Sequence, residues 1–218
     1  MSWVVCGYYT KDKIYEGHAK TFINSLKSFN IPYDVTPIES TNDWYEGMQQ
    51  KPQFLLDMLQ KYKPHSIVYV DVDAVFCQYP HLFDKIDKSM PDINIALHVL
   101  DHTKFRRKNH APEVLSGTIF LRNTNETCII LREWMTELKK DSKLWDQKGL
   151  AKVLRNRSFY ILPEEYCTIF DYMSSVKDPV IKHFQASREA KATKIRPKAR
   201  LRVVNSNNVL VKLGRKFK

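Results

Sequence analysis

Two carboxylates set two residues apart follow a short apolar run in the first half of the chain. The run at residues 66–70 reads SIVYV, and Asp71 and Asp73 come directly after it. Such a run is typical of a strand that is buried on both faces of a parallel sheet. Ligands of open α/β sheets bind at the carboxyl ends of these strands, and two acids there repel each other unless a cation lies between them. The spacing therefore predicts that Asp71 and Asp73 hold a cation.

Two other interpretations of the segment DVDAV, residues 71–75, stay open at this point. The two acids can be ordinary residues of a solvated turn. The string also fits the haloacid dehalogenase phosphatases, in which the first Asp attacks phosphorus and the second is a general acid beside Mg²⁺. That mechanism requires a later pair of acids of the GDxxxD type, which the sequence lacks. Its motif strand also normally lies near the start of the chain.

The segments before Asp71 predict the sheet that positions it. Apolar residues recur in the order strand, helix, strand, helix, strand, at residues 2–9, 11–29, 31–38, 51–62 and 66–70. This order predicts a parallel, doubly wound α/β sheet. In the second half, strands are expected at 93–99, from Gly117 within 116–124, at 159–163 and at 179–184, and helices at 125–140 and 143–156. Residues 98–114 are polar and basic with little periodicity, which indicates a loop.

Length and composition are those of a single globular domain. The chain has 218 residues, of which 43% are hydrophobic and 27% charged. We find no apolar run long enough to span a membrane and no basic segment typical of a signal peptide. The four cysteines form no CxxC pair, so we expect reduced thiols and a cytoplasmic location; they are Cys6, Cys77, Cys128 and Cys167.

The net charge of +11 is concentrated near the end of the chain. Residues 182–218 hold 12 Lys or Arg and one acid, Glu189, whereas the first 181 residues balance to zero. Such a tail is usually a solvated arm or a patch for polyanions. Nucleic-acid binding is the non-enzymatic alternative, although the tail lacks interleaved aromatic residues. We expect one domain at 1–186 and a basic segment at 187–218 that packs on it or leads to a further domain.

Five segments, in order, resemble the metal-dependent nucleotide-sugar glycosyltransferases of the GT-A fold. They are KPQFLLDML, IVYVDVDAVF, SGTIFLRNT, WDQKGLAKVL and IKHFQAS, and together they extend over nearly the whole chain. The compact size and the string SREAKA also resemble the small glycosyltransferase domains of large algal viruses, which modify the major capsid protein. The resemblance implies a single-domain α/β protein with a mostly parallel central sheet flanked by helices.

The resemblance also implies a set of site residues, with ordinary structural roles as the alternative for each. Asp71, Asp73 and His183 would ligate Mn²⁺ or Mg²⁺, whose preference for oxygen ligands suits the two carboxylates. Asp146 and Gln147 would be the catalytic pair beside the donor sugar. The implied nucleotide-sugar-binding residues are Tyr8, Thr10, Tyr15, Lys51, Asp71, Val72, Gly117, Thr118, Ser187, Arg188 and Lys191.

The implied reaction is the transfer of a hexose or deoxyhexose from a UDP-sugar to a glycan. Viral kinship would make the acceptor a glycan of a capsid protein and the location the host cytoplasm, with no nucleic-acid partner. The resemblance favours retention of the anomeric configuration, for which no dedicated general base is needed. An inverting enzyme would need a carboxylate base, and Asp146 and Asp101 are the candidates. His98 and His102 are expected as loop residues at the mouth of the acceptor site.

Overall fold

The computed structural model describes residues 2–39, 44–105 and 110–186, and every structural statement below concerns these residues. The described residues up to Phe184 form one compact unit. The expected basic segment at 187–218 lies outside the described residues, so its relation to the domain stays a prediction.

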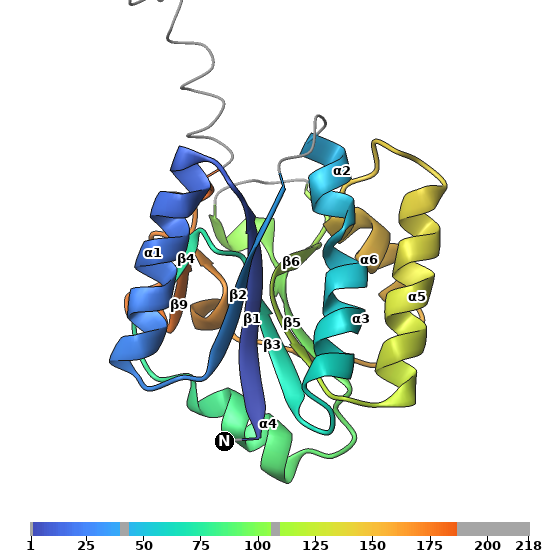
Figure 1. Ribbon diagram of the computed structural model, residues 1–218, viewed down its shortest axis with the longest axis horizontal. Helices are drawn as coiled ribbons and strands as arrows, with labels where there is room; N and C mark the ends of the chain where they lie inside the picture. Colours follow the sequence, from blue (N-terminus) through green and yellow to red (C-terminus); the bar gives the residue numbers. More distant parts are fainter. Residues whose placement is uncertain (1, 40–43, 106–109, 187–218) are drawn as a thin grey trace, which may run out of the picture. The chain divides into compact units, whose positions relative to one another are not determined.

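A six-stranded sheet forms the centre of this unit, in the order β2-β1-β3-β6-β5-β7 (Figure 1). β1 pairs in parallel with β2 and with β3, and β5 pairs in parallel with β7. β6 runs antiparallel to both of its neighbours, β3 and β5. The sheet is therefore mostly parallel, as predicted. The strands are β1 (Trp3–Thr10), β2 (Tyr33–Ile38), β3 (Ser66–Val70), β5 (Ile95–Leu100), β6 (Glu113–Leu121) and β7 (Tyr160–Ile161).

Helices cover both faces of this sheet (Figure 1). One face is covered by α3 (Lys51–Lys61), α5 (Asn125–Lys139) and α6 (Asp146–Leu154), and the other by α1 (Lys13–Ser28). Side chains on the two faces of β3 contribute to separate hydrophobic clusters, Ile67 and Tyr69 to one and Val68 and Val70 to the other. The prediction that this strand is buried on both faces is confirmed.

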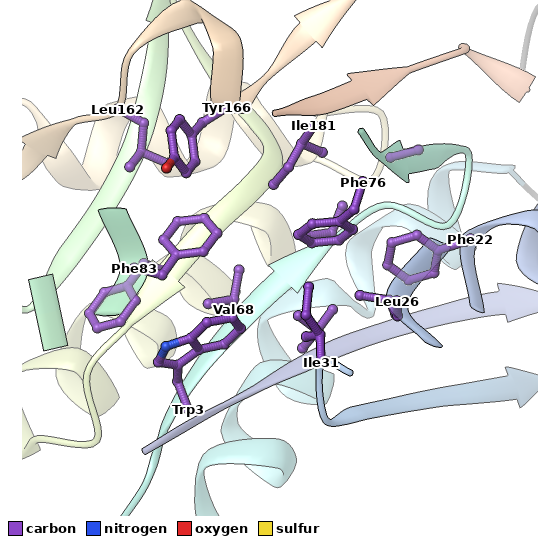
Figure 2. Packing of buried hydrophobic residues seen from close by; sticks show 14 of the residues in the cluster. Trp3, Phe22, Leu26, Ile31, Val68, Phe76, Phe83, Leu162, Tyr166 and Ile181 are labelled. Atoms are coloured by element: carbon purple, nitrogen blue, oxygen red, sulfur yellow. The ribbon is translucent and has the colours of Figure 1, made fainter. Parts of the chain in front are cut away.

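The cluster on the α1 face joins residues from distant parts of the chain (Figure 2). Trp3 and Val68 come from the sheet, Phe22 from α1 and Phe83 from α4 (His81–Ser89). The Trp3 and Phe83 rings meet edge to face, with centroids 5.7 Å apart. This packing fixes the positions of β1 and β3 relative to α1 and α4. It thereby also fixes the position of the residues that follow β3.

A second, three-stranded sheet was not predicted as such. Its order is β4-β9-β8, and its strands are β4 (Ala74–Phe76), β9 (Ile181–His183) and β8 (Thr168–Ile169). β4 pairs antiparallel with β9, and Ala74 lies opposite His183. Because β4 begins directly after Asp73, this pairing brings the end of the domain back to the end of β3.

The prediction of a loop at 98–114 is wrong at both ends of that range. β5 extends through Leu100, and β6 begins at Glu113, not at Gly117. A short 3-10 helix, η1 (His102–Phe105), follows β5. His98 is therefore not a loop residue: it lies in β5, its side chain is buried, and its Nδ1 is 2.8 Å from the Leu162 carbonyl oxygen.

Among the described residues, three helical elements besides η1 were not predicted: α2 (Trp44–Gln49), α4 and the 3-10 helix η2 (Glu164–Tyr166). Each is short, and a helix of one or two turns leaves little periodicity to detect. The four cysteines are free, as expected; Cys6 and Cys167 are buried and Cys77 is exposed. No described helix has the length and apolar character needed to cross a membrane.

Candidate active site

Three predicted metal ligands lie together at the carboxyl end of β3. Asp71, Asp73 and His183 each offer one ligand atom, and these atoms all lie within 4.8 Å of one another. Asp71 and Asp73 follow β3, and His183 ends β9. The pairing of β9 with β4 therefore brings His183 to the two carboxylates across more than a hundred residues of sequence.

The two oxygens of Asp71 have different surroundings. Its Oδ1 accepts the Tyr69 hydroxyl at 2.7 Å and lies 3.2 Å from the Lys51 ammonium. Its Oδ2 faces Gly117, where an added Cβ would lie 3.2 Å from it. Burial raises the pKa of Asp71, Lys51 opposes this shift and Asp73 adds to it. Tyr69 and Lys51 thus hold Oδ1 of this carboxylate, whereas Oδ2 faces Gly117 and not the Lys51 ammonium.

His183 presents its ring between the two sheets. Its Nε2 is 2.9 Å from the Thr118 hydroxyl, and its Nδ1 is 4.0 Å from Asp73 Oδ1. The bond to Thr118 leaves Nδ1 as the nitrogen on the carboxylate side, in the way that an outer partner commonly orients a ligating histidine. Burial opposes a charge on the ring, but Cys167, Asp73 and Asp71 outweigh it and raise the pKa of His183 to about 9. This site attracts positive charge.

Gly117 leaves the space in which these ligands meet. A Cβ at this position would lie 3.1 Å from His183 Cε1 and 3.2 Å from Asp71 Oδ2. The pairing of β5 with β6 contains a β-bulge here. Leu97 pairs with Ile119 and Val99 pairs with Val114, so β6 advances five residues while β5 advances two. Such bulges are frequent beside active sites. This one contains Ser116, Gly117 and Thr118, and all three contact site residues.

A buried ion-pair network connects the metal ligands to the predicted catalytic helix. The Lys51 ammonium lies 2.7 Å from Asp146 Oδ2 and 3.2 Å from Asp71 Oδ1, and Ser116 donates its hydroxyl to the same Asp146 oxygen. Burial opposes the charge on Lys51, but Asp146 and Asp71 outweigh it and raise its pKa. Lys51, predicted to bind the nucleotide-sugar, is only 4% exposed. Its ammonium faces these carboxylates.

The catalytic pair predicted on α6 is held at the start of that helix. Asp146 is buried, and its carbonyl oxygen accepts the Trp134 indole N–H from α5 at 2.8 Å. Gly149 allows close packing, because a Cβ there would lie 2.8 Å from Leu138 Cδ2. Gln147 points elsewhere and donates its side-chain N–H to Glu113 Oε1. Consecutive residues thus face two different parts of the molecule.

The other predicted nucleotide-sugar residues lie in varied surroundings. Tyr8 packs against Phe54, with ring centroids 5.0 Å apart, and donates its hydroxyl to the Gly47 carbonyl. Thr10 donates to Asp12, the N-cap residue of α1. Tyr15 and Val72 both belong to the hydrophobic cluster of the α1 face, Val72 fully buried and Tyr15 in part. Their role in donor binding stays a prediction; Ser187, Arg188 and Lys191 lie outside the described residues.

Asp101 is poorly suited to act as a base. Its carboxylate accepts both the backbone N–H and the hydroxyl of Thr103, and these bonds lower its pKa. A general base needs a pKa near the working pH, so a carboxylate with a lowered pKa is a weak candidate.

Three residues that touch the site were not singled out from the sequence. Tyr69 precedes Asp71 by two positions, so strand alternation could have placed both on one face. Ser116 adjoins the recognised Gly117, and its contact with Asp146 depends on the bulge. Glu113 carried no signal, because the start of β6 was expected four residues later.

Most of the chain matches a known protein family. Residues 10–199 match the family model described as nucleotide-diphospho-sugar transferase. The chain belongs to this family. This membership favours the transfer of a sugar from a nucleotide-diphospho-sugar over the phosphatase and nucleic-acid-binding alternatives. Within this transferase, the Asp71–Asp73–His183 cluster is a possible metal site in a family whose members often use divalent ions.

A plant relative of the chain is a xylosyltransferase by its name. The chain is 30% identical over 129 residues to the UDP-D-xylose:L-fucose alpha-1,3-D-xylosyltransferase MGP4 of Arabidopsis thaliana. The match includes 53% of this transferase and 35% of the relative, so it spans about a third of that protein's length.

Solved structures share the fold of this transferase at low sequence identity. A glycosyltransferase involved in the glycosylation of the major capsid of PBCV-1 superposes with a TM-score of 0.63 at 14% identity, with 88% of this chain and 98% of that chain covered. The glycosyltransferase GlyE of Streptococcus pneumoniae TIGR4 gives a TM-score of 0.57 at 12% identity, with 84% and 54% covered. The GT-A-type fold predicted from the sequence is confirmed.

Proposed function

We propose that this transferase moves a hexose or deoxyhexose from a UDP-sugar to a glycan acceptor and depends on Mn²⁺ or Mg²⁺. The observation that carries the proposal is the convergence of Asp71, Asp73 and His183 at the carboxyl end of β3. Two carboxylates and an imidazole are a donor set that suits Mn²⁺ and accommodates Mg²⁺. The gap beside Gly117, which a Cβ would fill, supports a bound ion at this place.

The bound ion would be held by Asp71, Asp73 and His183 and would neutralise the negative charge that builds on the leaving diphosphate. Neighbouring side chains orient these ligands before any ion binds. Tyr69 and Lys51 fix Oδ1 of Asp71, so that Oδ2 stays on the open side, and Thr118 fixes the ring of His183. Such prior orientation avoids reorganisation during the reaction.

Lys51 lies between Asp146 and Asp71, and this connection supports a role for Asp146 beside the donor sugar. Its Oδ2 is taken by Lys51 and Ser116, and both bonds hold the carboxylate beside the metal ligands. We assign it the positioning of sugar hydroxyls close to the reacting carbon. With retention of configuration, the leaving phosphate oxygen accepts the proton of the acceptor hydroxyl on the same face of the sugar. A protein base is then unnecessary, which agrees with the weak basicity of Asp101.

The named relatives define which donors and acceptors to try first. The Arabidopsis relative uses UDP-D-xylose and L-fucose by its name, and the PBCV-1 structure is named for glycosylation of a capsid protein. We therefore choose UDP-xylose as a donor and fucosides as acceptors, and add UDP-glucose and UDP-rhamnose as donors of a hexose and a deoxyhexose. A capsid-linked glycan is the acceptor that viral kinship would supply.

The test is a thermal-shift measurement with UDP and UDP-sugars, in Mn²⁺ and in EDTA. A ligand that binds only the folded state raises Tm. UDP should raise Tm in Mn²⁺ and leave it unchanged in EDTA. In Asp73→Asn the Mn²⁺-dependent shift should disappear, because one of the three ligands is lost.

Asp57→Asn is the matched control, since Asp57 is exposed on α3, where its carboxylate accepts a hydrogen bond from Gln53. It should keep the full shift. An equal shift by UDP in EDTA, or an unchanged shift in Asp73→Asn, would contradict the metal assignment.

A further inference from the structure

A second polar hollow lies at the same edge of the sheet as the metal ligands. It has a volume of about 350 Å³, and its lining includes His102, His110, Glu113, Val114, Gln147 and Ala151. This volume is at the low end of the range of roughly 300–1,000 Å³ for ligand sites. These residues come from η1, from the start of β6, from α6 and from the segment between η1 and β6. None of them is a proposed metal ligand.

Glu113 is held at both of its oxygens inside this hollow. Gln147 donates its side-chain N–H to Oε1, and His102 Nε2 lies 3.0 Å from Oε2. The other nitrogen of His102 lies 2.9 Å from the Tyr172 hydroxyl. With Nε2 donating to the carboxylate, Nδ1 accepts from this hydroxyl. The His102 side chain is 9% exposed and that of Glu113 is 35% exposed. The wall is thus fixed in orientation while its carboxylate stays open to a ligand.

The lining combines hydrogen-bonding groups with small apolar surfaces. A carboxylate, imidazoles and an amide can bind hydroxyl groups, while Ala111, Pro112 and Ala151 offer flat apolar contacts. Lys148 also lines the hollow, and its ammonium lies 5.6 Å from the centre of the Trp145 ring. A saccharide has this pattern of hydroxyl groups and apolar C–H faces. A phosphate group does not, and Glu113 would repel it.

Two elements connect this hollow to the donor centre. On α6, Asp146 belongs to the Lys51 network beside the metal ligands, and the next residue, Gln147, belongs to the hollow. On β6, Ser116 bonds to Asp146, and Glu113, three residues earlier, bonds to Gln147. The same pair of elements therefore forms one wall of each region, and the two regions adjoin at the start of α6.

We propose that this hollow is the subsite for a saccharide acceptor, in which Glu113 and His102 bind hydroxyl groups and Gln147 marks the border with the donor sugar. The proposal rests on the proposed glycosyltransfer. It assigns a binding role to Glu113, which the sequence did not indicate, and to the more deeply buried His102. His102 lines this hollow, whereas His98 is buried in β5.

The experiment uses the full chain with UDP and Mg²⁺ and a panel of methyl glycosides of glucose, galactose, xylose, rhamnose and fucose. Saturation-transfer NMR measures saccharide binding, and UDP release from the UDP-sugars measures turnover. The wild-type protein should bind at least one glycoside. Glu113→Gln and the space-filling Ala151→Phe should each weaken that binding at least tenfold, with the affinity for UDP changed less than twofold.

Glu126→Gln on the exposed side of α5 is the control and should bind the glycoside as the wild type does. Two results would overturn the subsite: no glycoside bound by the wild type, or equal binding in Glu113→Gln and Ala151→Phe with Tm values that show folded proteins. Failure of the proposed function looks different, because UDP would then neither bind with Mg²⁺ nor be released from any UDP-sugar.

Discussion

Lys51 has a role at the scale of single residues that its sequence position conceals. It lies at the start of a helix, where a lysine usually reaches solvent, yet it is 4% exposed between Asp71 and Asp146. Its ammonium also lies 4.9 Å from the centre of the Tyr69 ring. One buried cation thus compensates two carboxylates, one at the end of β3 and one at the start of α6.

Replacement of Lys51 by Met should destabilise the protein strongly. Removal of one partner from a buried ion pair costs about 3–5 kcal/mol, because the remaining charges lose their compensation. We expect a loss of about 3 kcal/mol in the free energy of unfolding, measured by urea denaturation. Lys20→Met, at an exposed position of α1, should change it by less than about 0.5 kcal/mol. A mild effect at Lys51 would mean that its ion pairs form only in part.

At the scale of elements, α6 depends on one glycine for its position. Gly149 faces Leu138 and Trp134 of α5, and Trp134 in turn binds the Asp146 carbonyl. The contact with α5 therefore determines the position of α6, and with it the positions of Asp146 and Gln147. Gln147 also reaches Glu113 on β6, so α6 joins three parts of the fold.

Gly149→Ala should reduce both stability and activity. Alanine normally favours a helix by about 1 kcal/mol over glycine, but here its Cβ would lie 2.8 Å from Leu138 Cδ2. Overpacking of this kind costs about 1–3 kcal/mol, and the displacement of α6 should lower turnover of the donor. Gly17→Ala on α1 is the matched control, because nothing lies within 4 Å of its Cβ. Urea denaturation should show a gain for Gly17→Ala and a loss for Gly149→Ala; the opposite order would contradict this account.

The parts of the site that the sequence predicted share a local signal. Asp71 and Asp73 follow a strand that apolar content alone identified, and Asp146 opens a helix with clear periodicity. The parts that it missed depend on long-range pairing. The Lys51 ion pairs join residues 51, 71 and 146, and the bulge in β6 arises from its fit against β5. Neither feature has a pattern in the neighbouring sequence.

At the scale of the whole molecule, His183 ties the two sheets together. It ends a strand of the small sheet and binds Thr118 of the large one, and its side chain is buried. The small sheet has strands of two or three residues, which are marginal without further contacts. The position of β9 therefore depends on this side-chain contact as well as on its pairing with β4.

His183→Ala should therefore show two effects together. The lost hydrogen bond and packing should lower the free energy of unfolding by about 1–3 kcal/mol without any ligand. Loss of a metal ligand should also weaken Mn²⁺-dependent UDP binding by roughly tenfold or more. Thr118→Val separates the two, since it removes only the partner of the ring and should weaken UDP binding less. Unchanged UDP affinity in His183→Ala, measured by calorimetry, would remove this residue from the ligand set.

The bulge in β6 bears on how such an enzyme can change its substrates. Beyond it, Ile119 and Leu121 keep their register with β3 and β5 in the core, while Val114 and Glu113 pair with the end of β5. Between these halves, residues 115–118 of β6 face a single residue of β5, His98. Insertions at a bulge can be absorbed locally, without a shift of the paired strands. The start of β6, which lines the proposed acceptor subsite, can therefore diverge during evolution while the paired core of the sheet stays unchanged.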